Sequence, residues 1–326
     1  MIPYQYSSGN ILTKTSSNLT SWSSGYTASS TSSKYGTTST IYNYMVTDTA
    51  RKYLVLFQNS SEDIYFVEYK DGGIAWSSPA AVSSANSPLL PSVELSDGIV
   101  IETHVISGSP SYVFESLKSG SWTSPVQTWE IFGSTDSTEI ISDYSPTFEY
   151  HNQAAVTYLV TANIDEEFSG YGLPELYWRY TGHKFTPTST PSIVLGHANI
   201  GELNASLTPV ALTDNNNRPK LYLFFTEPGT STNSENKIRF FIGSVTSITN
   251  GTISSWTGPY EIEESAYTSS KIDGVFIDDS DRLVITYRNH NTGAIDLAYS
   301  DDFGSNWDLI SGVAASTGAP SIVNLE

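Results

Sequence analysis

One aromatic residue recurs along the whole chain in a similar local context, and this recurrence limits the folds that the chain can adopt. Small hydroxylated residues and proline often follow it, as in Trp76-Ser77-Ser78-Pro79 and Trp122-Thr123-Ser124-Pro125. Successive copies lie 54, 46, 63, 71 and 51 residues apart. The six copies are Trp22, Trp76, Trp122, Phe185, Trp256 and Trp307. This regularity indicates an array of similar units, each of which is one supersecondary structure.

The last copy, Trp307, is the final residue of a motif that is typical of a turn. Residues Ser300 to Trp307 fit the pattern S-x-D-x-G-x-x-W, and alternating apolar residues precede and follow them. Serine and aspartate side chains can hydrogen-bond to turn amides, glycine accepts a positive φ, and tryptophan anchors the second strand. The segment Asp71 to Trp76 keeps the D-x-G-x-x-W half of the pattern. We therefore predict a hairpin turn whose structural residues are Ser300, Asp302, Gly304 and Trp307.

Four short strands can be placed in each unit. Before Trp76 they are Thr40–Val46, Tyr53–Phe57, Ile64–Tyr69 and the strand that carries the tryptophan itself. Such a meander forms a four-stranded antiparallel blade. At the chain ends, strands at Ile11–Thr15 and Trp22 would pair with an inner strand at Pro320–Leu325, which removes exposed edges. The sequence thus predicts a single all-β domain over 1–326, a six-bladed β-propeller closed by its N- and C-terminal strands.

Composition agrees with strands and restricts the partners. The chain has 21 Tyr, 13 Phe and 7 Trp but only 2 Met, which suits pleated surfaces. It has no Cys, so disulfides and thiolate nucleophiles are excluded. A net charge of -19 opposes binding to nucleic acid and to anionic membranes, and no apolar run is long enough to insert into a bilayer. No signal-peptide pattern opens the sequence. We nevertheless expect an extracellular or surface-exposed protein with a neutral or cationic partner.

The turn pattern and the repeat together resemble the Asp-box, or BNR repeat, of the sialidase-like β-propellers. The resemblance covers most of the chain and is strongest at Ser300 to Trp307. Because this box occurs in hydrolases, lectins and structural proteins, it implies architecture more directly than chemistry. For a sialidase it would imply three arginines that bind the substrate carboxylate, a tyrosine nucleophile assisted by a glutamate, and an aspartate that acts as acid and base.

Part of the sialidase site has matching residues in this chain. The segment Ser265 to Ser269, followed by Asp281 to Tyr287, looks like the region around the sialidase tyrosine. The resemblance therefore gives Tyr267 the role of nucleophile and Glu264 that of its helper. An arginine triad is not evident, because only Arg288 of the six arginines is well placed. We therefore do not expect sialidase activity.

A binding face is predicted opposite the motif turns, where the connections are longest. Long loops on a rigid scaffold commonly carry binding and catalysis. Tyrosine rings can stack on sugars while carboxylates bind their hydroxyl groups. Packing between blades is the alternative role for the tyrosines, and solvation of loops is the alternative role for the acids. The candidate ligand-binding residues are Tyr144, Tyr267, Arg288, His290, Glu227 and Glu264.

Three functions remain open at this stage. The first is lectin-like glycan recognition, and the second is hydrolysis of neutral glycans by a pair of carboxylates. The third is a structural or adhesive module of a virion or cell envelope. No cofactor is expected, although Asp278-Asp279-Ser280-Asp281 could bind Ca²⁺ through oxygen ligands or simply form a hairpin turn.

Replacing Tyr267 by alanine tests the predicted site. If the tyrosine ring is a binding platform, the variant loses glycan affinity and keeps its fold. Glycan titration together with circular dichroism measures both properties. Unchanged affinity in a folded variant would reject Tyr267 as part of the site.

Overall fold

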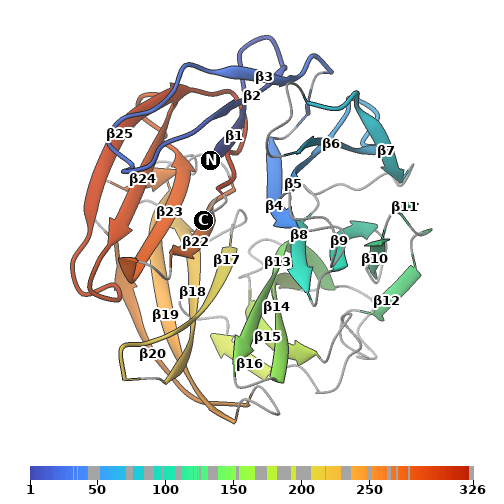
Figure 1. The fold of residues 1–326 in the computed structure, drawn as a ribbon. Helices are drawn as coiled ribbons and strands as arrows, with labels where there is room; N and C mark the ends of the chain where they lie inside the picture. The colour runs from blue at the N-terminus through green and yellow to red at the C-terminus, as the bar shows by residue number, and fades with distance from the viewer. Residues whose placement is uncertain are drawn as a thin grey trace.

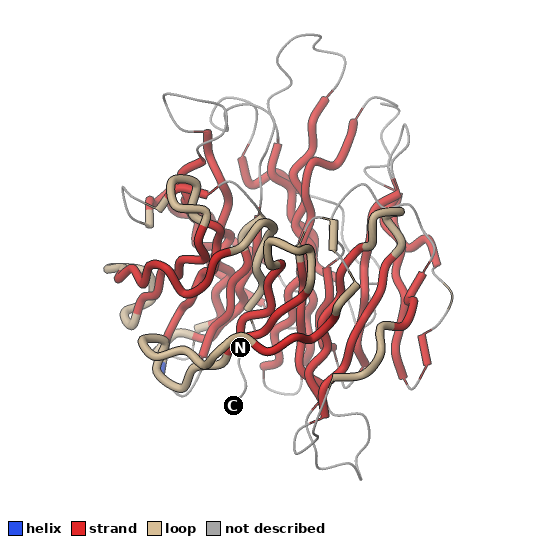
Figure 2. The backbone as a smooth tube through the Cα atoms, turned by 90° about the horizontal axis from the view of Figure 1, so that it is seen from above, coloured by secondary structure: helices blue, strands red, loops and turns tan. Residues whose placement is uncertain are grey.

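The computed structural model shows a ring of antiparallel sheets (Figure 1). The structure describes residues 1–31, 33–34, 36–42, 52–70, 76–83, 92–96, 99–106, 112–119, 121–122, 124, 126–130, 139–151, 154–165, 175–181, 192–195, 207–216, 218–228, 236–247, 252–262, 266–268, 271–277 and 280–322. Strands make up most of this part of the chain, as Figure 2 shows. Within it, no helix has the length and apolar character that crossing a membrane requires.

Six sheets, each built from consecutive strands, are present in the described chain. The first sheet has β1 (Ile2–Gln5), β2 (Ile11–Lys14) and β3 (Tyr26–Ser29). The second has β4 (Thr37–Tyr42), β5 (Lys52–Gln58), β6 (Ile64–Lys70) and β7 (Ala80–Ser83). The third has β8 (Ser92–Ser96), β9 (Ile99–Ile106), β10 (Tyr112–Ser119), β11 (Ser121–Trp122) and β12 (Val126–Glu130).

The second half of the chain forms the other three sheets. The fourth has β13 (Glu139–His151), β14 (Ala154–Asp165), β15 (Glu175–Thr181) and β16 (Ser192–Leu195). The fifth has β17 (Leu207–Thr213), β18 (Pro219–Pro228), β19 (Asn236–Ser247), β20 (Thr252–Glu261) and β21 (Tyr267–Thr268). The sixth has β22 (Asp273–Ile277), β23 (Arg282–Arg288), β24 (Ala294–Ser300) and β25 (Asp308–Ala315). Three of the six sheets have the predicted four strands, and the others have three or five.

In the second to sixth sheets the first strand faces the centre of the ring. Contacts join β4 to β8, β8 to β13, β13 to β17 and β17 to β22, so these inner strands are neighbours around the axis. Apolar side chains fill the spaces between adjacent sheets. Leu283, Ile285 and Tyr287 of β23 pack with Phe224 and Phe240 of the fifth sheet in one such cluster. On the other side of the same strand, Val284 packs with Ile2 and Tyr4 of β1. The alternation of faces along β23 thus fills two interfaces.

Recurrent tryptophans also bridge neighbouring sheets. Trp122 of the third sheet packs on Leu54 and Leu56 of the second, and Trp307 lies 5.9 Å from Phe224 of the fifth, measured between ring centroids. Trp22 packs in the cluster that holds Val284 and Leu297 of the sixth sheet. Each of these side chains therefore extends back to the preceding sheet of the ring. Phe185 lies outside the described residues.

The two ends of the chain meet beside the axis. The backbone N–H of Thr317 donates to Gln5 O at 3.1 Å, and that of Ser321 donates to Pro3 O at 3.1 Å. On its other side the same segment bridges Gly36 through Ala319. Residues 316–322, which we call the closing segment, thus lie between β1 and β4. The strand predicted at Trp22 is wrong, because this residue lies in the connection from β2 to β3, and β1 was not predicted.

Ring closure by these hydroxyl-rich contacts can be tested at Thr37. Its buried side-chain hydroxyl donates to Pro3 O at 3.1 Å and lies 3.2 Å from Ser321 Oγ. Thr37→Val keeps the shape but leaves these oxygens without that partner, so the free energy of unfolding should fall by about 1–2 kcal/mol. Urea denaturation measures the change. Thr20→Val is the matched control, because Thr20 is exposed and should shift stability by less than about 0.5 kcal/mol. Equal stability of the two variants would contradict this role of Thr37.

Candidate functional site

The S-x-D-x-G-x-x-W segment lies in the turn between β24 and β25, and its polar groups bond to one another. Gly304 N–H donates to Ser300 Oγ at 2.8 Å, and Asn306 N–H donates to Asp302 Oδ1 at 2.8 Å. Trp307 Nε1–H donates to Gly304 O at 3.2 Å. The positive φ of Gly304, 85°, suits glycine. Hydrogen bonds from Asn306 also lower the pKa of Asp302. These residues therefore build the turn itself.

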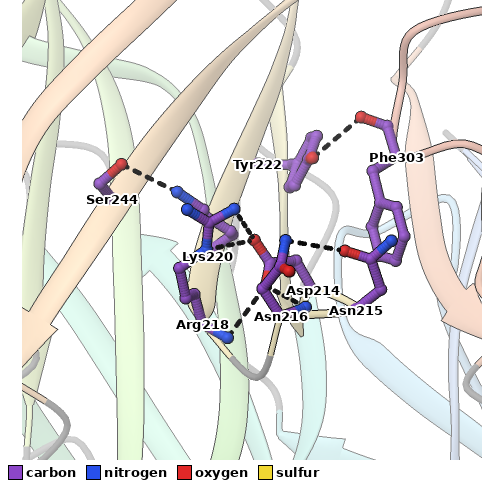
Figure 3. A network of polar contacts seen from close by, with 8 residues as sticks. All are labelled: Asp214, Asn215, Asn216, Arg218, Lys220, Tyr222, Ser244 and Phe303. Carbon is purple, nitrogen blue, oxygen red and sulfur yellow. Dashed lines mark hydrogen bonds and ion pairs between the residues drawn. The ribbon is translucent and has the colours of Figure 1, made fainter.

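A second network joins this turn to the fifth sheet (Figure 3). Tyr222 donates its hydroxyl to Phe303 O at 2.9 Å, and burial raises the pKa of Tyr222 to about 12. In the neighbouring β17–β18 turn, Asp214 accepts from the backbone N–H of Arg218 at 2.9 Å and pairs with its guanidinium. The Tyr222 contact thus connects the fifth and sixth sheets, and the Asp214 contacts stabilise the β17–β18 turn itself.

The opposite end of the ring, which we call the rim, carries the β23–β24 turn and most of the predicted ligand-binding residues. In the strand register, Glu227 of β18 lies opposite Lys237 of β19, which lies opposite Tyr267 of β21. Thr268 then bridges to Asn289 in the sixth sheet. Tyr267 therefore lies beside the third strand of the fifth sheet, counted from the axis, and not on an inner strand.

Ion pairs fix the outer part of the rim. Lys237 Nζ lies 3.0 Å from Glu261 Oε1, and Arg239 Nη2 lies 3.3 Å from Glu261 Oε2. The Glu261 carboxylate therefore pairs with both Lys237 and Arg239, which are two residues apart and so lie on the same face of β19. All three side chains keep about a quarter of their surface exposed, so the energetic contribution of each pair is modest.

The turn that presents Arg288 and His290 is rigid. Asn289 Oδ1 accepts from the backbone N–H groups of Asn291 and Thr292, and Asn289 Nδ2 donates to the buried Asp296 at 2.7 Å. Arg288 Nε–H donates to Ser316 O at 2.7 Å. This arginine therefore ties the sixth sheet to the closing segment, a contact that its position in the sequence does not reveal. His290 lies in the turn and is partly exposed.

Asp273 is a described carboxylate on one of the strands that face the ring axis. It begins the inner strand β22 and accepts from the backbone N–H of Ile322 at 3.0 Å and from that of Gly274 at 2.9 Å. The hydroxyl of Thr208, on the neighbouring inner strand β17, also hydrogen-bonds to it. The side chain is partly buried, and this desolvation raises the pKa of Asp273 to about 6 even though its hydrogen bonds act in the other direction.

Asp273 is not among the residues predicted from the sequence. The available signal was an acid inside the otherwise apolar strand of Ile272 to Ile277. An acid in such a strand must find partners or shift its pKa. The same signal applies to Asp296, whose carboxylate also accepts from Gly312 N–H at 2.8 Å inside its own sheet. The local sequence therefore identifies both Asp273 and Asp296 as unusual, but it does not show which of them lies on an inner strand.

Of the remaining candidate ligand-binding residues, the structure describes Tyr144 and does not describe Glu264. Tyr144 lies within the inner strand β13, opposite Thr161 of β14. Glu264, Asp278 and Asp279 lie outside the described residues. Among the residues that are described, no three His, Asp or Glu side chains gather as metal ligands would.

Comparisons with known proteins place the fold. No family model and no curated protein matches the sequence. An α-L-arabinanase of Penicillium chrysogenum, solved with arabinobiose, is 10% identical with a TM-score of 0.55, over 86% of this chain and 82% of the arabinanase. An α-L-arabinofuranosidase of Fusarium graminearum is 13% identical with a TM-score of 0.53, over 86% and 81%. A polysaccharide lyase that acts on ulvan is 11% identical with a TM-score of 0.54, over 95% and 80%.

At these identities the similarity concerns the fold alone. The chain is an all-β protein of antiparallel sheets, and its structural neighbours are β-propeller enzymes. No family-model match supports the resemblance to the sialidase-like family. The fold is therefore assigned from the structure rather than from the S-x-D-x-G-x-x-W pattern.

The raised pKa of Asp273 predicts a pH dependence of stability. Because the folded state holds this proton more tightly than the unfolded chain, the contribution of Asp273 to stability is fully present below about pH 4 and is lost as the pH rises through about 6. Relative to Asp273→Asn, which does not titrate, the wild type should lose about 3 kcal/mol across this interval. Urea denaturation at several pH values measures the difference.

Asp302→Asn is the control with the opposite sign. The pKa of Asp302 is lowered, so its stabilising contribution is present at neutral pH and is lost as the pH falls below about 4. If the stability difference between the wild type and Asp273→Asn were independent of pH, Asp273 would titrate normally and the prediction would be wrong.

Proposed function

We propose that this protein is a carbohydrate-active β-propeller that hydrolyses a glycosidic bond in a neutral glycan. The observation that carries the proposal is Asp273, a carboxylate near the axis of the ring with a raised pKa. The fold supports it, because the similar structures include an arabinanase, an arabinofuranosidase and a polysaccharide lyase. We infer further that the six sheets are six blades, with the closing segment as the inner strand of the first.

The environment of Asp273 suits acid–base chemistry. A carboxyl with a pKa of about 6 is partly protonated near neutral pH, so it can donate a proton to a leaving oxygen. Two backbone N–H groups and the Thr208 hydroxyl orient the carboxylate from different segments. We assign Asp273 the role of general acid or base on this ground.

Glycoside hydrolysis needs a second carboxylate. The proposal takes it from the rim, where Glu227 and Glu264 are the acids that the sequence analysis selects. A separation of about 5–5.5 Å between the two carboxyls gives retention at the anomeric carbon, and about 6.5–9.5 Å gives inversion. Tyr144, Tyr267, Arg288 and His290 would contact the sugar around this pair. A net charge of -19 makes a neutral glycan a better substrate than an acidic one.

The test is NMR of the protein with a panel of neutral and acidic oligosaccharides, following saturation transfer and the anomeric signals. We expect new anomeric signals with a neutral oligosaccharide, and their first configuration reports retention or inversion. Asp273→Asn should bind the same oligosaccharide and lower kcat by at least about a hundredfold. Glu227→Gln and Glu264→Gln identify the second acid, because only one of them should behave in the same way.

Other outcomes lead to the alternative functions. Saturation transfer without new anomeric signals would indicate lectin-like recognition. Silence in both measurements would favour a structural or adhesive module. Full turnover by Asp273→Asn would remove Asp273 from the mechanism and leave the hydrolase proposal to the rim acids.

A further inference from the structure

Tyr6 is an exposed aromatic residue at the rim that neither the sequence analysis nor the proposed mechanism uses. It follows β1 in the tight turn that leads to β2, and 44% of its surface is exposed. Three large hydrophobic residues of the described chain are exposed, namely Tyr6, Tyr26 and Tyr260. A tyrosine ring in water is a suitable platform for the apolar face of a sugar.

The backbone of this turn is held firmly. Tyr6 N–H donates to Asn10 O at 2.9 Å, and Gly9 N–H donates to Tyr6 O at 2.7 Å. The hydroxyl of Thr317, in the closing segment, also donates to Tyr6 O, at 3.2 Å. The positive φ of Gly9, 86°, is one that glycine adopts without strain. Because the turn is ordered before any ligand arrives, binding there would need little further ordering of the chain.

Hydrogen bonds connect the Tyr6 turn with the turn that carries His290. Ser316 accepts from Arg288 Nε–H through its carbonyl, and its own N–H donates to Gly293 O at 3.2 Å. Ser316 Oγ–H donates to Gln5 O at 2.9 Å. The β1–β2 turn, the closing segment and the β23–β24 turn therefore form one continuous surface around the buried Ser316.

The fully exposed residues of this surface are uncharged, although the chain as a whole is strongly acidic, and Arg288 and His290 beside them are partly buried. The fully exposed residues offer one aromatic ring, five hydroxyl groups and one carboxamide. We call them the neutral patch: Tyr6, Ser7, Ser8, Asn291, Thr292 and Thr317. An apolar platform beside neutral donors and acceptors is the combination that binding sites for neutral sugars use. A charged ligand would find no opposite charge among these six side chains.

We propose that the neutral patch is a glycan-binding subsite in which a neutral sugar ring stacks on Tyr6 and its hydroxyl groups bond to the surrounding side chains. This inference rests on the proposed function and extends it, because the subsite lies at the rim between the first and sixth sheets. It would hold a sugar unit remote from the bond that is cleaved. A long oligosaccharide would therefore reach it, and a short one would not.

The test compares Tyr6→Ala with the wild type on short and long neutral oligosaccharides. For long substrates we expect KM to rise about tenfold with kcat unchanged, since an aromatic contact of this kind corresponds to about a factor of ten. For the shortest substrate that is cleaved, both constants should stay as in the wild type. Tyr6→Phe keeps the ring and should retain most of the affinity.

Tyr26→Ala is the matched control. Tyr26 is also an exposed tyrosine, with 62% of its surface exposed, but it begins β3 at the other end of the first sheet. Its removal should leave all constants unchanged. Thermal unfolding of each variant checks that the fold is intact.

Two kinds of failure can be told apart. If Tyr6→Ala matches the wild type on long substrates, or if Tyr6→Ala and Tyr26→Ala lose affinity equally, the subsite is wrong while the hydrolase proposal stands. If the wild type neither binds nor cleaves any oligosaccharide, the proposed function fails and the subsite fails with it. A loss confined to acidic oligosaccharides would overturn the neutral character of the patch.

Discussion

The insertion of the closing segment between β1 and β4 is the interaction on which the ring depends. A row of sheets leaves two unpaired edges, and such edges are costly and prone to association. Here the edges pair through backbone bonds of Thr317 and Ser321 and through the bridge from Ala319 to Gly36. The buried hydroxyls of Thr37, Ser39 and Ser321 bond to one another at this junction. Small hydroxylated residues suit the position, because they satisfy buried backbone groups in little space.

A shared turn geometry links the repeated tryptophans to the spaces between sheets. At Trp307, Nε1–H donates to Gly304 O, and at Trp22 it donates to Leu19 O at 2.7 Å. Asn18 accepts from the backbone N–H of Ser21 at 2.9 Å, much as Asp302 accepts from Asn306. The turn at Trp22 is one residue shorter, and Leu19 has a φ of 62°. The same turn is thus built with different residues, so a search for its sequence pattern finds only the last copy.

The serine that follows two of these tryptophans has a fixed role. Ser23 Oγ accepts from Thr15 N–H at 3.0 Å, and Ser77 Oγ accepts from Glu68 N–H at 3.0 Å. In both places the serine N–H donates back to the same residue's carbonyl, at 2.9 and 2.7 Å. The Trp-Ser-Ser sequence therefore specifies how a strand leaves the turn, which explains why the aromatic repeat predicted the sheets better than the Asp-box pattern alone.

Sequence reasoning succeeded where a local pattern decides the structure. The predicted strands Tyr53–Phe57 and Ile64–Tyr69 lie within β5 and β6, because apolar side chains on both faces of these short segments favour a strand. It failed at β1, which has four residues and contains Pro3. Proline usually argues against a strand, since it lacks an N–H. In this position the Pro3 carbonyl is the group that matters, because it accepts from Ser321 and Thr37, and both partners are distant in sequence.

Partners that are distant in sequence also distinguish the two acids that lie within strands, Asp273 and Asp296. Asp273 and Asp296 both follow an isoleucine in an apolar strand. Asp296 obtains its donors from Asn289 and Gly312, within one sheet. Asp273 obtains one from its own neighbour Gly274, and the others from Thr208 of the fifth sheet and from Ile322 of the closing segment. Those segments meet only when the ring is closed. The position and proton affinity of the axial carboxylate are therefore properties of the closed ring, so closure of the fold and any acid–base chemistry at its axis depend on the same contacts.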